Sequence, residues 1–266
     1  SFAASTAKIN TDNGIITLMY HRFNENKYPS TNIKNEVFIE HLNEINNLQI
    51  EFITYEKFEK KVNSEIDKNY VLLTIDDAFE SFYKNAWPIL KEKKIPFILF
   101  VSTREIGKFG YMNWEEVKEI EKNNLVTIGN HSHSHEYLID WSDEKIIADL
   151  EKSIEIFNEN LGYSPKIFSY PFGEYSNNLK KIVSDLNFTF AFGQHSGVVD
   201  PTKNFLEMPR FPINEKYGDL KRFKSILQTL PFPYKSIEPE NRYLKKNNNP
   251  PKIEIQFFEN LININN

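Results

Sequence analysis

The sequence alternates short, almost wholly apolar runs with segments of helical periodicity, and this alternation restricts the fold more than any other feature. Apolar runs of strand length occupy residues 15–20, 70–75 and 96–101. A strand that is apolar throughout is buried on both faces, as in a parallel sheet covered by helices. Helical spacing follows in between, for example over residues 35–47. Strand and helix alternate seven or eight times, which predicts an α/β fold: a distorted (β/α) barrel of seven or eight mainly parallel strands.

The remaining elements follow from the same two periodicities. Further strands are expected at residues 52–55, 125–129, 166–170 and 188–192, with an extended piece at 206–213. Further helices are expected at residues 55–63, 79–93, 113–124, 142–161 and 177–187. Pro88 should kink the helix in which it stands, because proline lacks a backbone N–H and clashes with the preceding turn. His41 lies on the apolar stripe of its helix and is interpreted as a packing residue.

The length and composition favour one barrel-sized domain. A chain of 266 residues with 40 % hydrophobic residues can bury an ample core. We expect a leader at residues 1–12, the domain at residues 13–236, and a C-terminal extension or truncated β element at residues 237–266. Within the extension, residues 245–251 should form a linker or turn, and residues 253–258 a strand that either packs on the barrel or begins another domain.

Charge and cysteine content exclude several classes of function. A net charge of −5 argues against a nucleic-acid-binding surface. The absence of cysteine excludes disulfides, thiolate metal sites and cysteine nucleophiles. Small residues at positions 3–7 resemble the surroundings of a signal cleavage site, although an artificial start of the chain would look the same. A periplasmic, extracellular or cell-envelope location is therefore expected. No apolar run reaches the ~18 residues that a transmembrane helix needs.

Two groups of polar residues follow predicted strands and suggest a metal site. Three of the six histidines fall within residues 131–135, and Asp76 and Asp77 end an apolar run. His21 also follows a predicted strand. Zinc and its neighbours accept imidazole nitrogen together with a carboxylate, so two histidines and one aspartate with an open position would form a catalytic site. Taken singly, the histidine cluster can be a solvated loop, and the aspartate pair a turn or a helix cap.

Three motifs in this order resemble those of the polysaccharide deacetylases of carbohydrate esterase family four, which have the NodB-homology fold. Residues 74–78 resemble the family's Thr-Phe-Asp-Asp-Gly motif. Residues 131–135 fit its His-Ser/Thr-x-x-His motif, and residues 170–173 a Tyr-Pro-Tyr-Gly variant. The resemblance covers about residues 14–215. It implies a NodB-type barrel and an enzyme that acts on an acetylated polysaccharide or oligosaccharide.

The resemblance also implies roles for individual residues. Asp77, His131 and His135 would bind the metal and Asp76 would be the general base, whereas His133 lies between the ligands and is not one of them. The family's late Leu-x-His motif, which supplies the general acid, is absent here. A branch of the family that deacetylates poly-N-acetylglucosamine uses an early Tyr-His instead, which residues 20–21 match, so His21 becomes the expected acid.

Two residues depart from the family pattern. Ala78 stands where the motif has glycine, which should be tolerated if its φ is negative. Tyr170 stands where many members have an arginine that orients the base. Arg210 is the candidate replacement, with a surface ion-pairing role as the alternative, and His195 is a rival to His21 as the acid.

Substrate contacts are expected from the third motif, at Tyr170, Pro171 and Phe172. Trp114 is a further aromatic candidate, because sugar rings pack on aromatic faces.

The function implied by the resemblance is hydrolysis of N-acetyl groups on amino-sugar units of a polysaccharide. The metal, most simply zinc with cobalt, nickel or iron as alternatives, would polarise the acetyl carbonyl and activate water. Asp76 would accept the water proton, the backbone N–H of Phe172 would support the oxyanion, and His21 would protonate the leaving amine. The alternatives are an O-acetyl ester hydrolase acting on a glycan such as xylan, and a non-catalytic glycan-binding protein on the same scaffold.

Overall fold

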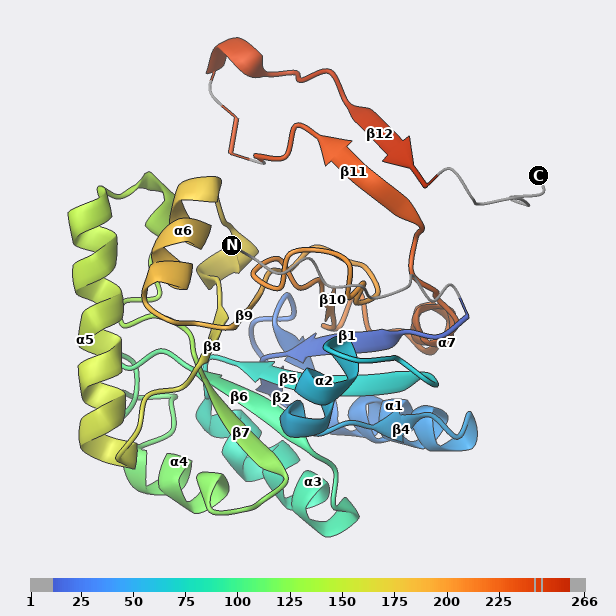
Figure 1. Cartoon of the computed structure of the whole chain (residues 1–266). Coiled ribbons are helices and arrows are strands. Elements are labelled where there is room, and N and C mark those ends of the chain that lie inside the picture. The colour runs from blue at the N-terminus through green and yellow to red at the C-terminus, as the bar shows by residue number, and fades with distance from the viewer. Residues whose placement is uncertain (1–11, 242, 245, 259–266) are drawn as a thin grey trace.

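One parallel sheet lies at the centre of the computed structural model, which describes residues 12–241, 243–244 and 246–258 (Figure 1). The strand order is β10-β1-β5-β6-β7-β8-β9, and β4 also pairs with β5. Every pair in this sheet is parallel. The strands are β1 (Ile15–Tyr20), β4 (Glu51–Phe52), β5 (Tyr70–Asp76), β6 (Phe97–Val101), β7 (Val126–Asn130), β8 (Ile167–Ser169), β9 (Phe190–Phe192) and β10 (Phe211–Pro212).

The sheet curls until its two edges nearly meet. β9 and β10 do not pair as strands, but a single parallel bridge joins Phe192 to Met208, just before β10. The N–H of Met208 donates to the carbonyl of Ala191 at 2.8 Å, and the N–H of Gly193 donates to the carbonyl of Met208 at 2.9 Å. The predicted distorted barrel is confirmed as a curled parallel sheet with flanking helices.

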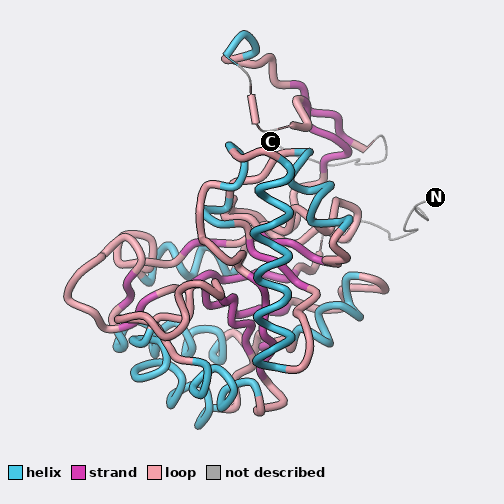
Figure 2. The backbone as a smooth tube through the Cα atoms, turned by 90° about the vertical axis from the view of Figure 1, so that its left-hand side faces the viewer, coloured by secondary structure: helices cyan, strands magenta, loops and turns pink. Residues whose placement is uncertain are grey.

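Seven α-helices cover this sheet in the described part of the chain (Figures 1 and 2). They are α1 (Asn35–Asn47), α2 (Tyr55–Val62), α3 (Trp87–Lys93), α4 (Trp114–Glu121), α5 (Asp143–Leu161), α6 (Asn177–Asp185) and α7 (Leu220–Leu227). The long helix α5 is capped by Ser142, whose side chain accepts from the N–H of Lys145, and ends at Gly162 with φ 78°. Both signals are readable in the sequence.

The helix expected over residues 79–93 is divided. Residues Phe82–Ala86 form a π-helical turn, and α3 starts after it with Pro88 in its first turn. Proline is tolerated in the first turn of a helix, where its missing N–H has no helical partner. The predicted kink therefore takes the form of a π turn that precedes the proline.

The apolar strands are buried on both faces, as their composition predicts. Along β5, Val71, Leu73 and Ile75 pack into the core shared with α1, α3, α4 and α7. Tyr70 and Leu72 point to the opposite face, into a second core cluster that includes Phe58 of α2. This alternation explains why an uninterrupted apolar run is a strand here rather than a helix.

A two-stranded antiparallel sheet projects from the barrel at the C-terminal side (Figure 1). It consists of β11 (Tyr234–Glu238) and β12 (Glu254–Phe257). The strand expected at residues 253–258 is thus confirmed, but it pairs with β11 rather than with the barrel. The expected domain boundary after residue 236 falls inside β11. The expected leader lies almost wholly outside the described residues.

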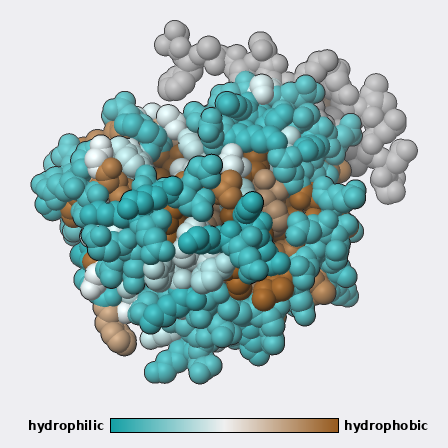
Figure 3. All heavy atoms as spheres, turned by 90° about the horizontal axis from the view of Figure 1, so that it is seen from below, coloured by the Kyte–Doolittle hydropathy of each residue, from teal (hydrophilic) through white to brown (hydrophobic). Residues whose placement is uncertain are grey.

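The face shown in Figure 3 is mostly hydrophilic, with hydrophobic residues in separate patches. Within the described residues, no helix has both the length and the apolar character that a membrane crossing requires.

His41 of α1 is a buried packing residue, as predicted. Its ring stacks on Phe223 of α7 at 3.9 Å between ring centroids. Its Nε2 lies 2.6 Å from the carbonyl of Gly218, and its Nδ1 lies 2.9 Å from the hydroxyl of Tyr20. A neutral ring satisfies both contacts, with Nε2–H donating and Nδ1 accepting. Burial lowers the pKa of His41 to about 4, although the Gly218 carbonyl and Asp219 oppose the shift.

This pKa predicts a pH-dependent loss of stability. His41 has a lower pKa in the folded chain than in the unfolded chain, where it is about 6.5. Its contribution to stability is therefore complete above about pH 6.5 and is lost as the pH falls toward about 4. Between about pH 8 and pH 5 the free energy of unfolding should fall by roughly 2 kcal/mol from this residue alone. Urea unfolding of the wild type and of His41→Gln at both pH values measures this loss of stability. The wild type should lose more stability than the variant between the two pH values. Equal losses would contradict a lowered pKa of His41.

Candidate active site

Four of the predicted site residues, His21, Asp76, Asp77 and His131, lie at the carboxyl ends of parallel strands. Asp76 is the last residue of β5, and His131 follows the last residue of β7. His21 follows Tyr20, which is paired with Ile75 of β5, so His21 lies level with Asp76. In a parallel barrel the strand ends share one rim, and this is where catalytic groups are found.

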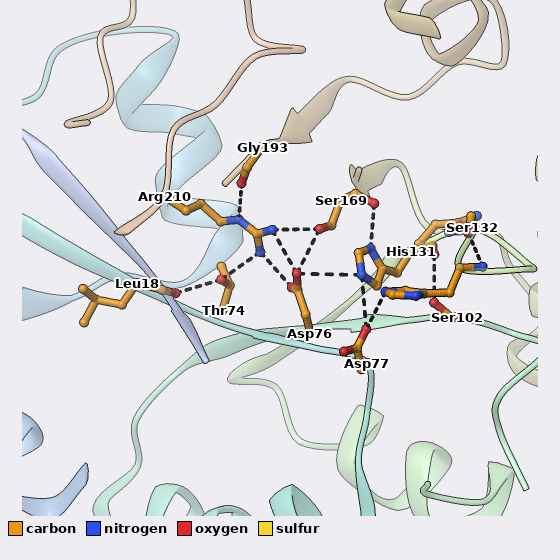
Figure 4. A network of polar contacts seen from close by, with 12 residues as sticks. Leu18, Thr74, Asp76, Asp77, Ser102, His131, Ser132, Ser169, Gly193 and Arg210 are labelled. Atoms are coloured by element: carbon orange, nitrogen blue, oxygen red, sulfur yellow. Dashed lines mark hydrogen bonds and ion pairs between the residues drawn. The ribbon is translucent and has the colours of Figure 1, made fainter. Parts of the chain in front are cut away.

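Asp77, His131 and His135 form a compact group of possible metal ligands. Figure 4 shows Asp77 beside His131 in this group. One ligand atom from each side chain lies within 4.8 Å of the other two. Asp77 Oδ1 is 3.2 Å from His131 Nε2 and 3.1 Å from His135 Nε2. His133, which lies between the two histidines in the sequence, is not part of this group. Its Nδ1 lies 2.9 Å from Thr103 Oγ1. The resemblance excluded His133 as a ligand, and the structure places it accordingly.

The chemistry of this group fits a zinc-type ion. His131 Nδ1 lies 2.7 Å from the carbonyl of Ser169, so this nitrogen carries the proton and Nε2 presents its lone pair to the group. Asp77 Oδ1 is buried, and among the described residues it accepts no hydrogen bond of good geometry. Burial alone would raise the pKa of Asp77, but the two imidazoles and His21 hold it well below its usual range. A buried, ionised oxygen beside two imidazole nitrogens is a donor set for a divalent transition metal.

The loop that carries the two histidines is fixed by buried polar side chains. Asp149 of α5 accepts hydrogen bonds from the N–H groups of His133 at 3.0 Å and Ser134 at 3.1 Å. The Ser132 hydroxyl accepts from the N–H of His135 at 2.9 Å. Ser132 and His135 both have positive φ, at 67° and 53°, which is unusual for residues other than glycine. The loop therefore holds a strained shape through groups outside the ligand set.

An Asp149→Asn variant tests this support. Asparagine offers one acceptor oxygen instead of two, so one of the two loop N–H groups loses its partner. Outer-shell groups that orient ligands are worth roughly 10- to 100-fold in metal affinity. We expect zinc affinity, measured by competition with a chelating dye, to fall within about this range while the folded structure is retained. Asp143→Asn, at the exposed start of the same helix, is the control, and equal affinities in both variants would contradict the role of Asp149.

Asp76 lies beside the ligand group and is held by Arg210. The guanidinium binds the carboxylate through two contacts, Nη1 to Oδ1 at 2.7 Å and Nη2 to Oδ2 at 2.9 Å. Arg210 is fully buried, and it also donates to Gly193, Thr74 and Ser169. Asp76 Oδ2 is 3.8 Å from His131 Nε2. Burial alone would raise the pKa of Asp76, but the charges of Arg210 and His131 lower it. The surface alternative for Arg210 is excluded by its burial.

Of the two histidines considered as the acid, His21 lies with the site. Burial lowers the pKa of His21, and the charges of Asp77 and Asp76 act in the opposite direction. The ring of His195 instead contacts the Tyr175 ring at 5.9 Å, and its carbonyl accepts from the N–H of Arg210. The structure therefore brings His21 to the carboxylate pair.

Comparison with known proteins finds similarity to one family over part of the chain. The family model described as polysaccharide deacetylase matches residues 63–191, which include Asp76, Asp77, His131 and His135. This part of the chain, a little under half of it, resembles the polysaccharide deacetylases. The chain is 29 % identical over 178 residues to a poly-beta-1,6-N-acetyl-D-glucosamine N-deacetylase of Staphylococcus aureus, which covers 62 % of this chain and 60 % of that protein. The protein of the same name from Staphylococcus epidermidis is 24 % identical over 177 residues, 61 % of each chain. The chain thus spans about three fifths of the length of these relatives.

Solved structures share the fold of this chain. The deacetylase PplD of Streptococcus pyogenes, in complex with acetate, superposes with a TM-score of 0.73 at 20 % identity, over 81 % of this chain and 99 % of that one. IcaB from Ammonifex degensii superposes with a TM-score of 0.72 at 23 % identity, over 82 % of this chain and 100 % of that one. At these identities the match concerns the fold.

The residue at the family's glycine position has a strained backbone. Ala78 has φ 54° and Asp77 has φ 76°, so the turn after β5 runs through the left-handed region. The condition expected for tolerance, a negative φ at Ala78, is therefore not met. An L-residue pays about 1 to 2 kcal/mol for this conformation. The buried Ala78 side chain packs in the core, and this contact offsets part of that cost.

The third motif contributes differently from the expectation. Tyr170 is fully buried, and its hydroxyl donates to the carbonyl of Leu206. Its side chain packs in the core cluster formed with α5 and α6 and therefore cannot contact a sugar. The expectation that Tyr170 binds the substrate is wrong. Pro171 is also buried. Phe172 is exposed and its ring lies 4.9 Å from that of His135. Trp114 is half-buried and packs against Phe157 of α5 at the edge of the core.

Three residues of the site escaped the sequence analysis. Ser169 holds both Arg210 and His131, and its position at the end of a strand was the available signal. Asp149 is a charged residue on the buried face of α5, next to Leu150, which is itself unusual. Tyr137 stacks on Phe172, and nothing in the local sequence indicates it.

Proposed function

We propose that this protein is a zinc-dependent hydrolase that removes N-acetyl groups from the amino-sugar units of a polysaccharide. The observation that supports this most is that two adjacent carboxylates have different partners. Asp77 contacts the two imidazoles, whereas Asp76 forms a salt bridge with Arg210. Such a pair can separate metal binding from proton transfer within one site. The names of the staphylococcal relatives suggest a β-1,6-linked N-acetylglucosamine polymer as the substrate. A polymer of this kind fits a periplasmic, extracellular or cell-envelope location.

The metal would be held by Asp77, His131 and His135. When bound there, zinc polarises an acyl carbonyl and lowers the pKa of a water molecule toward ~7. Asp76, whose lowered pKa keeps it ionised at neutral pH, would accept the proton of that water. Arg210 would fix the carboxylate in one orientation by its two contacts.

The remaining steps fall to residues on the other strands of the rim. His21, at the end of β1, would return a proton to the leaving amine nitrogen. The backbone N–H of Phe172 is the candidate donor to the developing oxyanion. The amine product and acetate account for the bond that is broken and for the water that is consumed.

Removing and restoring the metal tests the proposal. The protein is stripped with a chelator and reloaded with zinc or cobalt, and acetate release is measured from β-1,6-linked N-acetylglucosamine oligosaccharides and from acetylated xylan. We expect release from the glucosamine substrate only, and only after reloading. Release from xylan alone would indicate an ester hydrolase. No release from either, with one equivalent of metal bound, would contradict an enzymatic role on these glycans and favour glycan binding.

A further inference from the structure

Two exposed aromatic rings stand together at the edge of the candidate active site. Tyr137 is 43 % exposed and Phe172 is 45 % exposed. Their rings are stacked with centroids 4.8 Å apart and planes inclined by 26°. Phe172 also contacts the ring of the candidate ligand His135. The pair thus extends outward from the proposed metal group.

The two rings come from different loops, and each is next in sequence to a buried residue. Tyr137 lies in the loop between β7 and α5, and the next residue, Leu138, is buried. Phe172 lies in the loop between β8 and α6, between the buried Pro171 and Gly173. Phe172 has φ 60°, an unfavourable conformation for a bulky residue. A strained aromatic residue that remains exposed at a candidate site points to a function for its ring.

Charged groups border this aromatic pair. Glu136, which precedes Tyr137, is paired with Arg104 at 3.3 Å, and both side chains are substantially exposed. Arg104 also donates to the carbonyl of Ser134 within the histidine loop. An apolar platform with hydrogen-bonding groups at its border suits a pyranose ring, whose C–H groups pack on an aromatic face while its hydroxyls bind polar groups.

We propose that Tyr137 and Phe172 form a binding subsite for a sugar unit adjacent to the one that is deacetylated. This inference rests on the proposed function, since it assigns the neighbouring unit of the same glycan to this platform. The subsite would make the protein prefer oligosaccharides to a single N-acetylated sugar. Tyr137 is then a specificity residue, which contributes to binding of the polymer and not to the chemistry at the acetyl group.

The test compares Tyr137→Ala and Tyr137→Phe with the wild type, all loaded with zinc. The control is Tyr163→Ala, because Tyr163 is exposed to a similar extent, 39 %, and follows α5 at the opposite end of the sheet. Binding of a β-1,6-linked N-acetylglucosamine oligosaccharide is measured by calorimetry. Turnover is measured on this oligosaccharide and on a small aryl acetate, which can occupy only the reacting position.

We expect Tyr137→Ala to weaken binding of the oligosaccharide and raise its KM on the order of tenfold, the size of one lost stacking contact. Zinc affinity and turnover of the aryl acetate should stay unchanged, and Tyr137→Phe should behave as the wild type. Equal oligosaccharide binding by Tyr137→Ala and the wild type would overturn the subsite, as would a parallel loss on both substrates.

The same measurements separate this inference from the proposed function. A wild-type protein that binds the oligosaccharide through Tyr137 but releases no acetate would retain the subsite and reject the deacetylase. If the wild-type protein releases acetate and Tyr137→Ala binds and reacts equally well, the deacetylase is retained and the subsite is rejected. If the wild-type protein neither binds the oligosaccharide nor releases acetate, both proposals are rejected.

Discussion

Replacing Asp76 by Asn should reduce turnover by about 10² to 10⁴ while leaving the metal in place. The side chain keeps its shape but can no longer accept a proton. Asp76 approaches His131 Nε2 only to 3.8 Å and its oxygens bind Arg210, so the group formed by Asp77, His131 and His135 should remain intact. Acetate release and bound zinc, determined on the same preparation, measure the two effects separately.

The matched variant for this experiment is His131→Ala. It removes a proposed ligand whose Nδ1 lies 2.7 Å from the carbonyl of Ser169, so both zinc binding and turnover should be lost. Thermal unfolding should show that both variants are folded. Turnover by Asp76→Asn close to that of the wild type would reject Asp76 as the base, and loss of zinc from Asp76→Asn would show that it acts as a ligand instead.

Replacing Arg210 by Met should both destabilise the fold and impair turnover. Arg210 and Asp76 are fully buried, and the substitution leaves a carboxylate without its cationic partner. Removing one partner of a buried ion pair typically costs about 3 to 5 kcal/mol. The freed carboxylate also loses its fixed orientation, and its pKa should rise, which makes it a poorer base near the lower end of the active pH range. Urea unfolding and acetate release measure the two effects.

A double variant shows whether the loss comes from the unpaired charge. In Arg210→Met/Asp76→Asn the carboxylate that lost its cationic partner is no longer present, so part of the stability lost in Arg210→Met should return. The two residues are in contact, and their effects on unfolding should therefore be far from additive. Arg210→Lys keeps the charge but lacks the two-pronged geometry, so we expect an intermediate result. Additive effects would contradict the coupling seen in the structure.

The apolar pattern of the sequence predicts the barrel and the rim on which the candidate site lies. Runs such as residues 70–75 are apolar throughout, which requires burial on both faces and hence a parallel sheet with helices outside. Parallel strands bring their carboxyl ends to one rim, so the polar residues after β5 and after β7 were expected on the same side of the sheet. The choice of Asp77, His131 and His135 among them came from the resemblance to the deacetylase motifs. Elements with strong local signals, such as α5 with Ser142 and Gly162 at its ends, were also found at nearly their observed bounds.

Features that depend on tertiary packing were less accessible. Arg210 contacts Asp76 across 134 residues, and it does so only because the sheet curls and brings the segment before β10 back to β1. The positive φ of Ala78 follows from the turn geometry, not from the residue type, since alanine rarely adopts it. The burial of Tyr170 depends on which face of β8 meets α5 and α6.

Two short elements, α7 and β11, were not predicted from the sequence because they also depend on tertiary packing. Helix α7, which was not predicted, has eight residues and depends for its stability on packing. Its Phe223 stacks on His41, a contact that no local pattern reveals. Strand β11 was missed because its partner β12 lies beyond a polar segment, and its pairing gives no signal in either strand alone.

The most direct measurement is the ratio of free amine to acetate released from a β-1,6-linked N-acetylglucosamine oligosaccharide by the zinc-loaded protein. We expect one new primary amine for each acetate, with neither product formed by the zinc-free protein or by His131→Ala. Acetate without amine, or equal release in the absence of zinc, would contradict metal-dependent N-deacetylation by the group formed by Asp77, His131 and His135.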